Sequence, residues 1–160
     1  MTTTNNQTHT SETTQLESLY NALNVQIANW SLLYGKLHNF HWYVKGENFY
    51  TLHAKFEELY DQATAYMDDV AERLLAIGGR PVATLKEQLE LSTLLEATGT
   101  ESANQMVGSL VEDFATLSGE MTETIVLAEQ LSDQPTADLL IGIRRDVEKA
   151  AWMLNAYLGR

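Results

Sequence analysis

Apolar residues recur along the chain at the three- and four-residue spacing that is typical of amphipathic helices. Four long stripes of this kind predict four long helices. The first stripe runs from Leu16 to Phe40, and the second runs from Phe49 to Ile77. The third runs from Met106 to Ala128, and the fourth from Leu139 to Leu158. Each stripe leaves polar residues on its opposite face, so the helices are expected to share one core.

The segments between the stripes carry signals that end and begin helices. Gly46 and Asn48 separate the first two stripes, and the sequence IGGRP ends the second with a glycine and a proline. The sequence LSDQPTAD offers the capping residues Ser132 and Asp133, followed by Pro135. Between the second and third stripes, ATLKEQLEL predicts a short helix that lies across the bundle. The expected fold is therefore all-α, a four-helix bundle with a long middle connection.

Length and composition fit one helical domain. The chain has 160 residues, with two prolines and nine glycines. Residues 1–13 are rich in Thr and Asn and lack an apolar period, which predicts a disordered N-terminal tail before a bundle domain at residues 14–160. The tail resembles neither a secretory nor a transit signal, and no stretch approaches the roughly 20 apolar residues of a membrane span. The expected location is cytoplasmic, with no membrane partner.

Charge and cysteine content narrow the possible chemistry. The chain has no cysteine, which excludes disulfides, thiolate metal sites and cysteine nucleophiles. Any bound metal must therefore be held by nitrogen and oxygen. The formal net charge of −12 repels nucleic acid phosphates and attracts cations.

The second predicted helix carries a stripe of residue types that bind metals. At about 100° per residue, His53, Glu57, Asp68 and Glu72 fall within one arc of the helix. Glu57 and Asp68 are nevertheless about 17 Å apart along the axis, whereas the ions of a dinuclear site lie about 3.5 to 4 Å apart. One copy of the helix therefore cannot close a single dinuclear site with all four residues.

A second copy of the same helix would close this gap. The positions of His53 and Glu72 have the same midpoint as those of Glu57 and Asp68. An antiparallel two-fold pairing centred beside Ala63 would therefore bring His53 to Glu72, and Glu57 to Asp68, of the other copy. Such two-fold contacts are the commonest in homo-oligomers, and one axis would complete two equivalent sites.

Two histidines of the first helix lie close to this stripe in the sequence. His41, near the end of the helix, could add an imidazole from the same chain as His53. His38 is expected to be a neighbour, because the helix can aim only one of the two well at the site. Each acidic residue taken alone is better explained as part of a solvated helix face, and only the combination favours a metal site. The Glu-x-x-His motif of ferritin bundles does not occur, which again favours a site at an interface.

Three segments resemble the Dps mini-ferritins, the DNA-binding proteins from starved cells, over about residues 16–160: HNFHWYVKGENFYTLHAKFEELYDQ, MDDVAERLLAIGGRPVATLKE and WMLNAYLGR. The resemblance implies a dodecameric shell of ferritin-like bundles with a di-iron ferroxidase centre between two-fold-related chains. It assigns His41, His53 and Glu57 to one chain, and Asp68 and Glu72 to its mate. This agrees with the two-fold pairing inferred above.

The resemblance also implies a reaction and an expected substrate. Family members oxidise Fe(II), typically with hydrogen peroxide as the preferred oxidant, and store the ferric mineral, which protects against oxidative damage. Imidazoles and carboxylates also bind Zn and Mn, so the ligand types alone do not choose the metal. Trp42 matches a tryptophan that lies beside the centre in the family, although a core aromatic explains it equally well. Family members more often have aspartate where this chain has Glu57.

Acidic residues flank the start of the fourth predicted helix, where family members line a three-fold pore. These residues are Glu129, Asp133 and Asp138, and a ring of such acids would concentrate cations. Asp133 is equally well explained as a helix cap.

Direct DNA binding is not expected, despite the name of the family. Members that bind DNA often use a tail rich in Lys or Arg, and residues 1–13 contain neither. Two alternatives to an iron-storing cage remain: a DNA-compacting stress protein and a non-catalytic helical oligomer. Stoichiometric oxidation of Fe(II) by peroxide would separate the cage from both.

Overall fold

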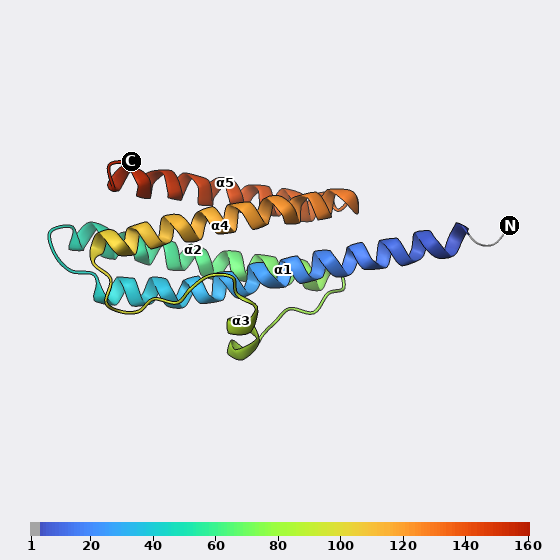
Figure 1. Ribbon diagram of the computed structural model, residues 1–160, viewed down its shortest axis with the longest axis horizontal. Helices are drawn as coiled ribbons and strands as arrows, with labels where there is room; N and C mark the ends of the chain where they lie inside the picture. The colour runs from blue at the N-terminus through green and yellow to red at the C-terminus, as the bar shows by residue number, and fades with distance from the viewer. Residues whose placement is uncertain (1–3) are drawn as a thin grey trace.

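The described part of the chain contains four long helices and one short helix. The computed structural model describes the backbone of residues 4–160 and the side chains of residues 13–160. The helices are α1 (Thr4–Tyr43), α2 (Phe49–Ala76), α3 (Leu85–Leu91), α4 (Ala103–Gln130) and α5 (Gln134–Tyr157). Within the described residues there is no strand, and α3 lies in the connection between α2 and α4 (Figure 1). The predicted all-α fold with a short helix in its middle connection is confirmed.

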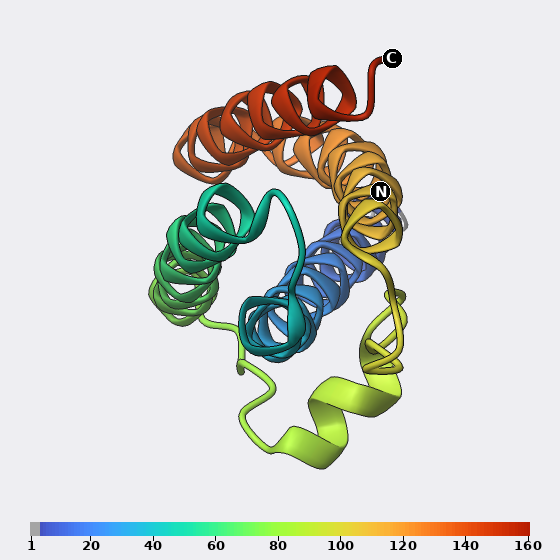
Figure 2. The ribbon, with the colours of Figure 1, turned by 90° about the vertical axis from the view of Figure 1, so that its left-hand side faces the viewer.

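The long helices form two antiparallel pairs. α1 packs chiefly against α2, and α4 packs chiefly against α5. The view along the bundle shows the four helices around a common interior, with α3 outside them next to α1 (Figure 2). The short connection of residues 44–48 brings the end of α1 beside the start of α2, which positions the candidate site.

The predicted apolar stripes supply the core. Their buried members include one large aromatic from each of three helices and leucines from every long helix: Trp30, Leu33, Leu37, Phe56, Leu74, Leu110, Phe114, Leu117 and Leu154. Several predicted core positions are less buried than expected, and two of them show the reason. Leu75 is 60% exposed, because it lies about 100° around α2 from the buried Leu74. Leu139 is only partly buried, and its neighbour Leu140 is the fully buried residue.

The helix ends follow the signals in the sequence. Gly46 and Gly78, at φ 105° and 90°, adopt the left-handed conformation that favours glycine at the two ends of α2. Thr84 and Glu87 form a capping box at the start of α3. At the start of α5 the cap is Asp133, whose carboxylate accepts a hydrogen bond from the Thr136 backbone N–H. Of the two capping residues suggested by the sequence, Asp133 therefore has this role.

The predicted disorder of the N-terminal tail is not tested by the structure and stays a prediction. α1 begins at Thr4, before the first apolar stripe, but almost all side chains of residues 1–13 lie outside the described residues. Among the helices described, none is long and apolar enough to cross a membrane.

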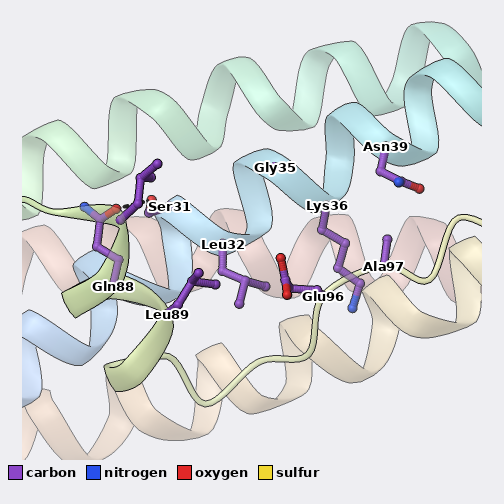
Figure 3. Close-up of a pocket in the computed structure, with 10 residues that line it drawn as sticks. Ser31, Leu32, Gly35, Lys36, Asn39, Gln88, Leu89, Glu96 and Ala97 are labelled. Carbon is purple, nitrogen blue, oxygen red and sulfur yellow. Dashed lines mark hydrogen bonds between the residues drawn. The ribbon is translucent and has the colours of Figure 1, made fainter.

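A cavity of about 280 Å³ lies between α1 and α3. Its wall combines apolar residues such as Leu32 and Leu89 with polar residues such as Ser31, which donates a hydrogen bond to Gln88 (Figure 3). None of the histidines or carboxylates predicted to bind metal lines this cavity. The candidate metal centre therefore lies elsewhere, where α1 ends and α2 begins.

Candidate metal centre

The imidazoles of His41 and His53 face each other across the junction of α1 and α2. The two rings stack, with centroids 3.6 Å apart and an angle of 18° between their planes. Each Nδ1 lies 2.8 Å from the backbone carbonyl oxygen of the other histidine. Because a carbonyl oxygen can only accept a hydrogen bond, both Nδ1 atoms carry hydrogen. In the neutral rings, both Nε2 atoms are therefore left with the free lone pair that binds a metal.

Aromatic neighbours hold these two rings in place. Phe49, one helical turn before His53, stacks on the His53 ring with centroids 4.9 Å apart. Tyr60 presents its edge to His41, with centroids 5.4 Å apart. His41 is only 9% exposed, while His53 is partly buried. The imidazole pair is therefore ordered by the chain itself.

His38 has different partners from the other two histidines. Its Nδ1 donates to the Tyr34 carbonyl oxygen over 2.9 Å, and its ring stacks on Tyr60 with centroids 3.9 Å apart. Trp42 lies beside His38, with ring centroids 5.2 Å apart, and is 68% exposed. Trp42 is thus not a core aromatic of this chain, and it remains beside the imidazole cluster on the surface.

The three predicted carboxylate ligands are exposed on α2. Glu57 lies one turn after His53, while Asp68 and Glu72 lie toward the other end of the helix. No Lys or Arg in the described part of the chain forms an ion pair with any of them. Within that part, no group of three or more His, Asp or Glu side chains is arranged so that it could hold a metal ion. One chain therefore brings together His41 and His53 but not the complete predicted ligand set.

Comparison with known proteins places the chain in a family. A ferritin-like domain family matches residues 20–160. General stress protein 20U of Bacillus subtilis is 52% identical over 143 residues, covering 89% of this chain and 99% of that protein. A solved structure of a Dps protein from Bacillus brevis has a TM-score of 0.89 and 50% identity, covering 91% of this chain and 97% of that chain. The chain belongs to the Dps mini-ferritin family.

A more distant Dps structure shares the fold and links it to a metal class. The Vibrio cholerae Dps protein has a TM-score of 0.87 and 35% identity, covering 91% of this chain and 92% of that chain. It is described as a member of a broad superfamily of ferritin-like diiron-carboxylate proteins. Membership of the Dps family supports a role for this chain in iron storage and protection.

The predicted pore acids of this Dps chain have different surroundings. Glu129 and Asp138 are exposed, whereas Asp133 accepts a hydrogen bond from Arg73 Nη2 over 2.6 Å and caps α5. Burial raises the pKa of the Asp133 carboxyl, but the hydrogen bonds from Thr136 and the Arg73 guanidinium outweigh burial and lower it overall. These contacts support the capping interpretation of Asp133.

The sequence did not reveal the groups that orient the two imidazoles. The backbone carbonyls of His41 and His53 carry no sequence signal, because every residue has one. Phe49 could have been found, since it lies four residues before His53 on the same helix face. Tyr60 contacts His41 from another helix, so only the tertiary structure identifies it.

Proposed function

We propose that this Dps chain is a ferroxidase of an iron-storing cage. It oxidises Fe(II), preferably with hydrogen peroxide, at di-iron sites between two-fold-related chains and stores the ferric product inside a dodecameric shell. The observation that carries the proposal is the paired, pre-oriented imidazoles of His41 and His53, with both Nε2 atoms available.

The proposed site combines residues of two chains. His41, His53 and Glu57 come from one chain, and Asp68 and Glu72 come from its two-fold mate. The three carboxylates are exposed and have no basic partner in the described part of the chain, so they are free to neutralise the charge of incoming Fe(II). The same donors would accept Zn or Mn, which we expect to inhibit by competition.

The chemistry uses two Fe(II) ions as substrates. Two ions held together supply two electrons, which with two protons reduce one hydrogen peroxide to two water molecules and leave two Fe(III). A paired transfer avoids the hydroxyl radical that one-electron reduction of peroxide would release. Trp42, on the surface beside His38, would border the site.

Assembly into a shell is supported by large apolar residues on the surface of the single chain. Leu85, Leu89 and Leu95 are 76%, 53% and 79% exposed, and they follow α2 in the connection that contains α3. Exposed apolar surface of this kind is typical of contacts with other chains. Asp138 and Glu129, which are exposed, are the better candidates for an acidic entry pore, because Asp133 is engaged by Arg73 and Thr136.

The shared site is tested with mixed oligomers. One variant carries His53→Ala with Glu57→Ala, and the other carries Asp68→Ala with Glu72→Ala. Each pure variant should lose stoichiometric Fe(II) oxidation by peroxide, measured by absorbance of the ferric product. Co-assembled variants should regain activity, since a mixed two-fold pair contains one intact site.

The control for this experiment is the assembly itself. Differently tagged subunits purified through both tags establish that mixed oligomers have formed. If such oligomers show no more activity than the pure variants, the site is not shared between chains. Active mixed oligomers would also exclude a purely structural, non-catalytic oligomer.

A further inference from the structure

The start of α2 departs from the usual pattern of helix capping. Asn48 occupies the N-cap position, where an asparagine side chain usually accepts a hydrogen bond from a backbone N–H of the first turn. At φ −97° and ψ 20° it makes no such bond. Thr84, Ser102 and Asp133 do make it, at the starts of α3, α4 and α5. A local rule that is broken at one position while its counterparts obey it indicates that the side chain has another role.

The Asn48 side chain reaches the end of α5, which lies at the same end of the molecule as the connection between α1 and α2 (Figure 1). Its Nδ2 donates to the Tyr157 hydroxyl oxygen over 3.0 Å. With the amide turned over, Oδ1 would accept from the same hydroxyl, so the contact exists in either orientation. Tyr157 packs against the core and is the last residue of α5. The chain after it turns at Gly159, φ 75°, and the Arg160 N–H donates to the Asn155 carbonyl oxygen over 2.9 Å, which closes the helix end.

Asn48 is also joined to the first turn of α2, which carries Phe49. The Asn48 carbonyl oxygen accepts a hydrogen bond from the Leu52 N–H over 3.0 Å, and Phe49 follows Asn48 directly. The Phe49 ring stacks on His53 with an angle of 26° between the ring planes, and the His53 ring stacks on that of His41. A shift of Asn48 would therefore move Phe49 and, through it, the imidazole of His53.

We propose that Tyr157 is a positioning residue of the candidate metal centre. Its hydroxyl holds Asn48, and Asn48 fixes the first turn of α2. Phe49 in that turn then keeps the His53 imidazole in the orientation that leaves Nε2 for a metal. Because a ligand that is already oriented loses less conformational freedom on binding, this contact should raise the affinity for metal. The end of α5 thus acts on a centre to which it supplies no proposed ligand.

Titration of the assembled protein with Co²⁺, followed by the visible absorption of the bound ion, tests the proposal. Tyr157→Phe removes only the hydroxyl and should weaken Co²⁺ binding about threefold, less than the loss of a direct partner of a ligand. Asn48→Ser keeps a side chain that can cap α2 but loses the amide that reaches Tyr157. It should weaken binding to a similar extent without lowering the thermal unfolding midpoint. Tyr20→Phe is the matched control, because it removes a hydroxyl that donates to the Ile77 carbonyl oxygen over 2.6 Å at the other end of α2. It should bind Co²⁺ as the unchanged protein does.

A double-mutant cycle tests whether Tyr157 acts through Phe49. Phe49→Leu should weaken Co²⁺ binding roughly tenfold, since it removes the ring that stacks on His53. Adding Tyr157→Phe to Phe49→Leu should cause no further loss, because the hydroxyl then has no ring left to position. Additive losses, unchanged Co²⁺ binding in Tyr157→Phe, or an equal loss in Tyr20→Phe would each overturn the proposal.

This inference rests on the proposed function, but the two can fail separately. A Co²⁺ spectrum that persists in His53→Ala would come from another site and would overturn the role of Tyr157. Protein that binds Co²⁺ as described but does not oxidise Fe(II) would overturn the ferroxidase and still support this role. Normal Fe(II) oxidation by the unchanged protein, together with unchanged Co²⁺ affinity in Tyr157→Phe, would overturn the role of Tyr157 alone.

Discussion

Each of the two central histidines fixes the tautomer of the other. His41 and His53 exchange hydrogen bonds from Nδ1 to backbone carbonyl oxygens, both over 2.8 Å. The backbone carbonyl is part of a helix and cannot turn away easily, so this arrangement is more rigid than one made with a side chain. His38 makes the same kind of bond to Tyr34, but its ring is stacked on Tyr60. The three histidines thus have different surroundings, and only His41 and His53 form a mutually oriented pair.

Substitution of His53 should affect Fe(II) oxidation differently from substitution of His38. His53→Ala is expected to slow Fe(II) oxidation by peroxide roughly ten- to hundredfold, because it removes a proposed ligand and the ring that stacks on His41. Stopped-flow absorbance of the ferric product measures this rate. His38→Ala is the matched control and should stay within about twofold of the unchanged protein. An equal loss in both variants would contradict the assignment of His53 as a ligand.

At the scale of the elements, one ion pair joins the end of α2 to the start of α5. Arg73 Nη2 lies 2.6 Å from Asp133 Oδ1, and Arg73 Nε donates to the Thr136 hydroxyl over 2.8 Å. The tight turn between α4 and α5 contains Ser132 at φ 58°, a left-handed conformation that is uncommon outside glycine. The Arg73 contacts therefore hold a turn whose backbone is otherwise strained.

This contact predicts a pH dependence on the acid side. The pKa of Asp133 is lower in the folded chain than its ordinary value of 3.8, so its charge stabilises the fold above that pH. The stabilisation should be lost as the pH falls through the folded pKa. Asp133→Asn should lower the thermal unfolding midpoint near pH 7, and the difference from the unchanged protein should shrink below about pH 4.

Asp138→Asn is the control for that measurement. It removes an exposed carboxylate of the same helix that has no ion-pair partner among the described side chains. A difference between Asp133→Asn and the unchanged protein that stays constant from pH 7 to pH 3 would show that the charge of Asp133 does not stabilise the turn.

At the scale of the whole molecule, the negative charge of the chain argues against the DNA binding that the family name implies. The formal net charge is −12, with ten Lys and Arg against 22 Asp and Glu. Four basic side chains, Lys55, Lys86, Arg144 and Arg145, each form an ion pair with an exposed acid of the same chain, so their charge is already partly neutralised. An acidic shell built from such chains would repel the phosphate backbone and attract cations such as Fe(II).

The assembled protein is therefore expected not to bind DNA appreciably. A gel-shift assay at low salt and near-neutral pH gives binding its best chance, because phosphate contacts weaken as salt rises. The positive control is the same chain with a Lys-rich segment added at its N-terminus, which should retard DNA. Tight binding by the unextended, metal-free protein would overturn this prediction.

The sequence by itself determined the helices, their order and most of the core. Apolar spacing encodes which face of a helix is buried, so Leu33, Phe56 and Leu117 could be assigned without coordinates. It failed at positions such as Leu75 and Leu139, since one residue more or less turns a helix by about 100° and only packing decides which neighbour is buried. Local helix-end signals likewise identified where α2 and α5 begin or end. They did not show which of the two candidate residues caps the start of α5.

Part of the candidate metal centre could likewise be predicted from the sequence, and the rest required the tertiary structure. Residue types and spacing singled out His41, His53 and Glu57, because metal ligation needs particular side chains at particular helical positions. Only the tertiary structure decided that two carbonyls hold the imidazoles with both Nε2 atoms free, since backbone groups are the same in every residue. It also decided that Trp42 is exposed and that Asp133 is bound by Arg73, because both depend on which helices meet.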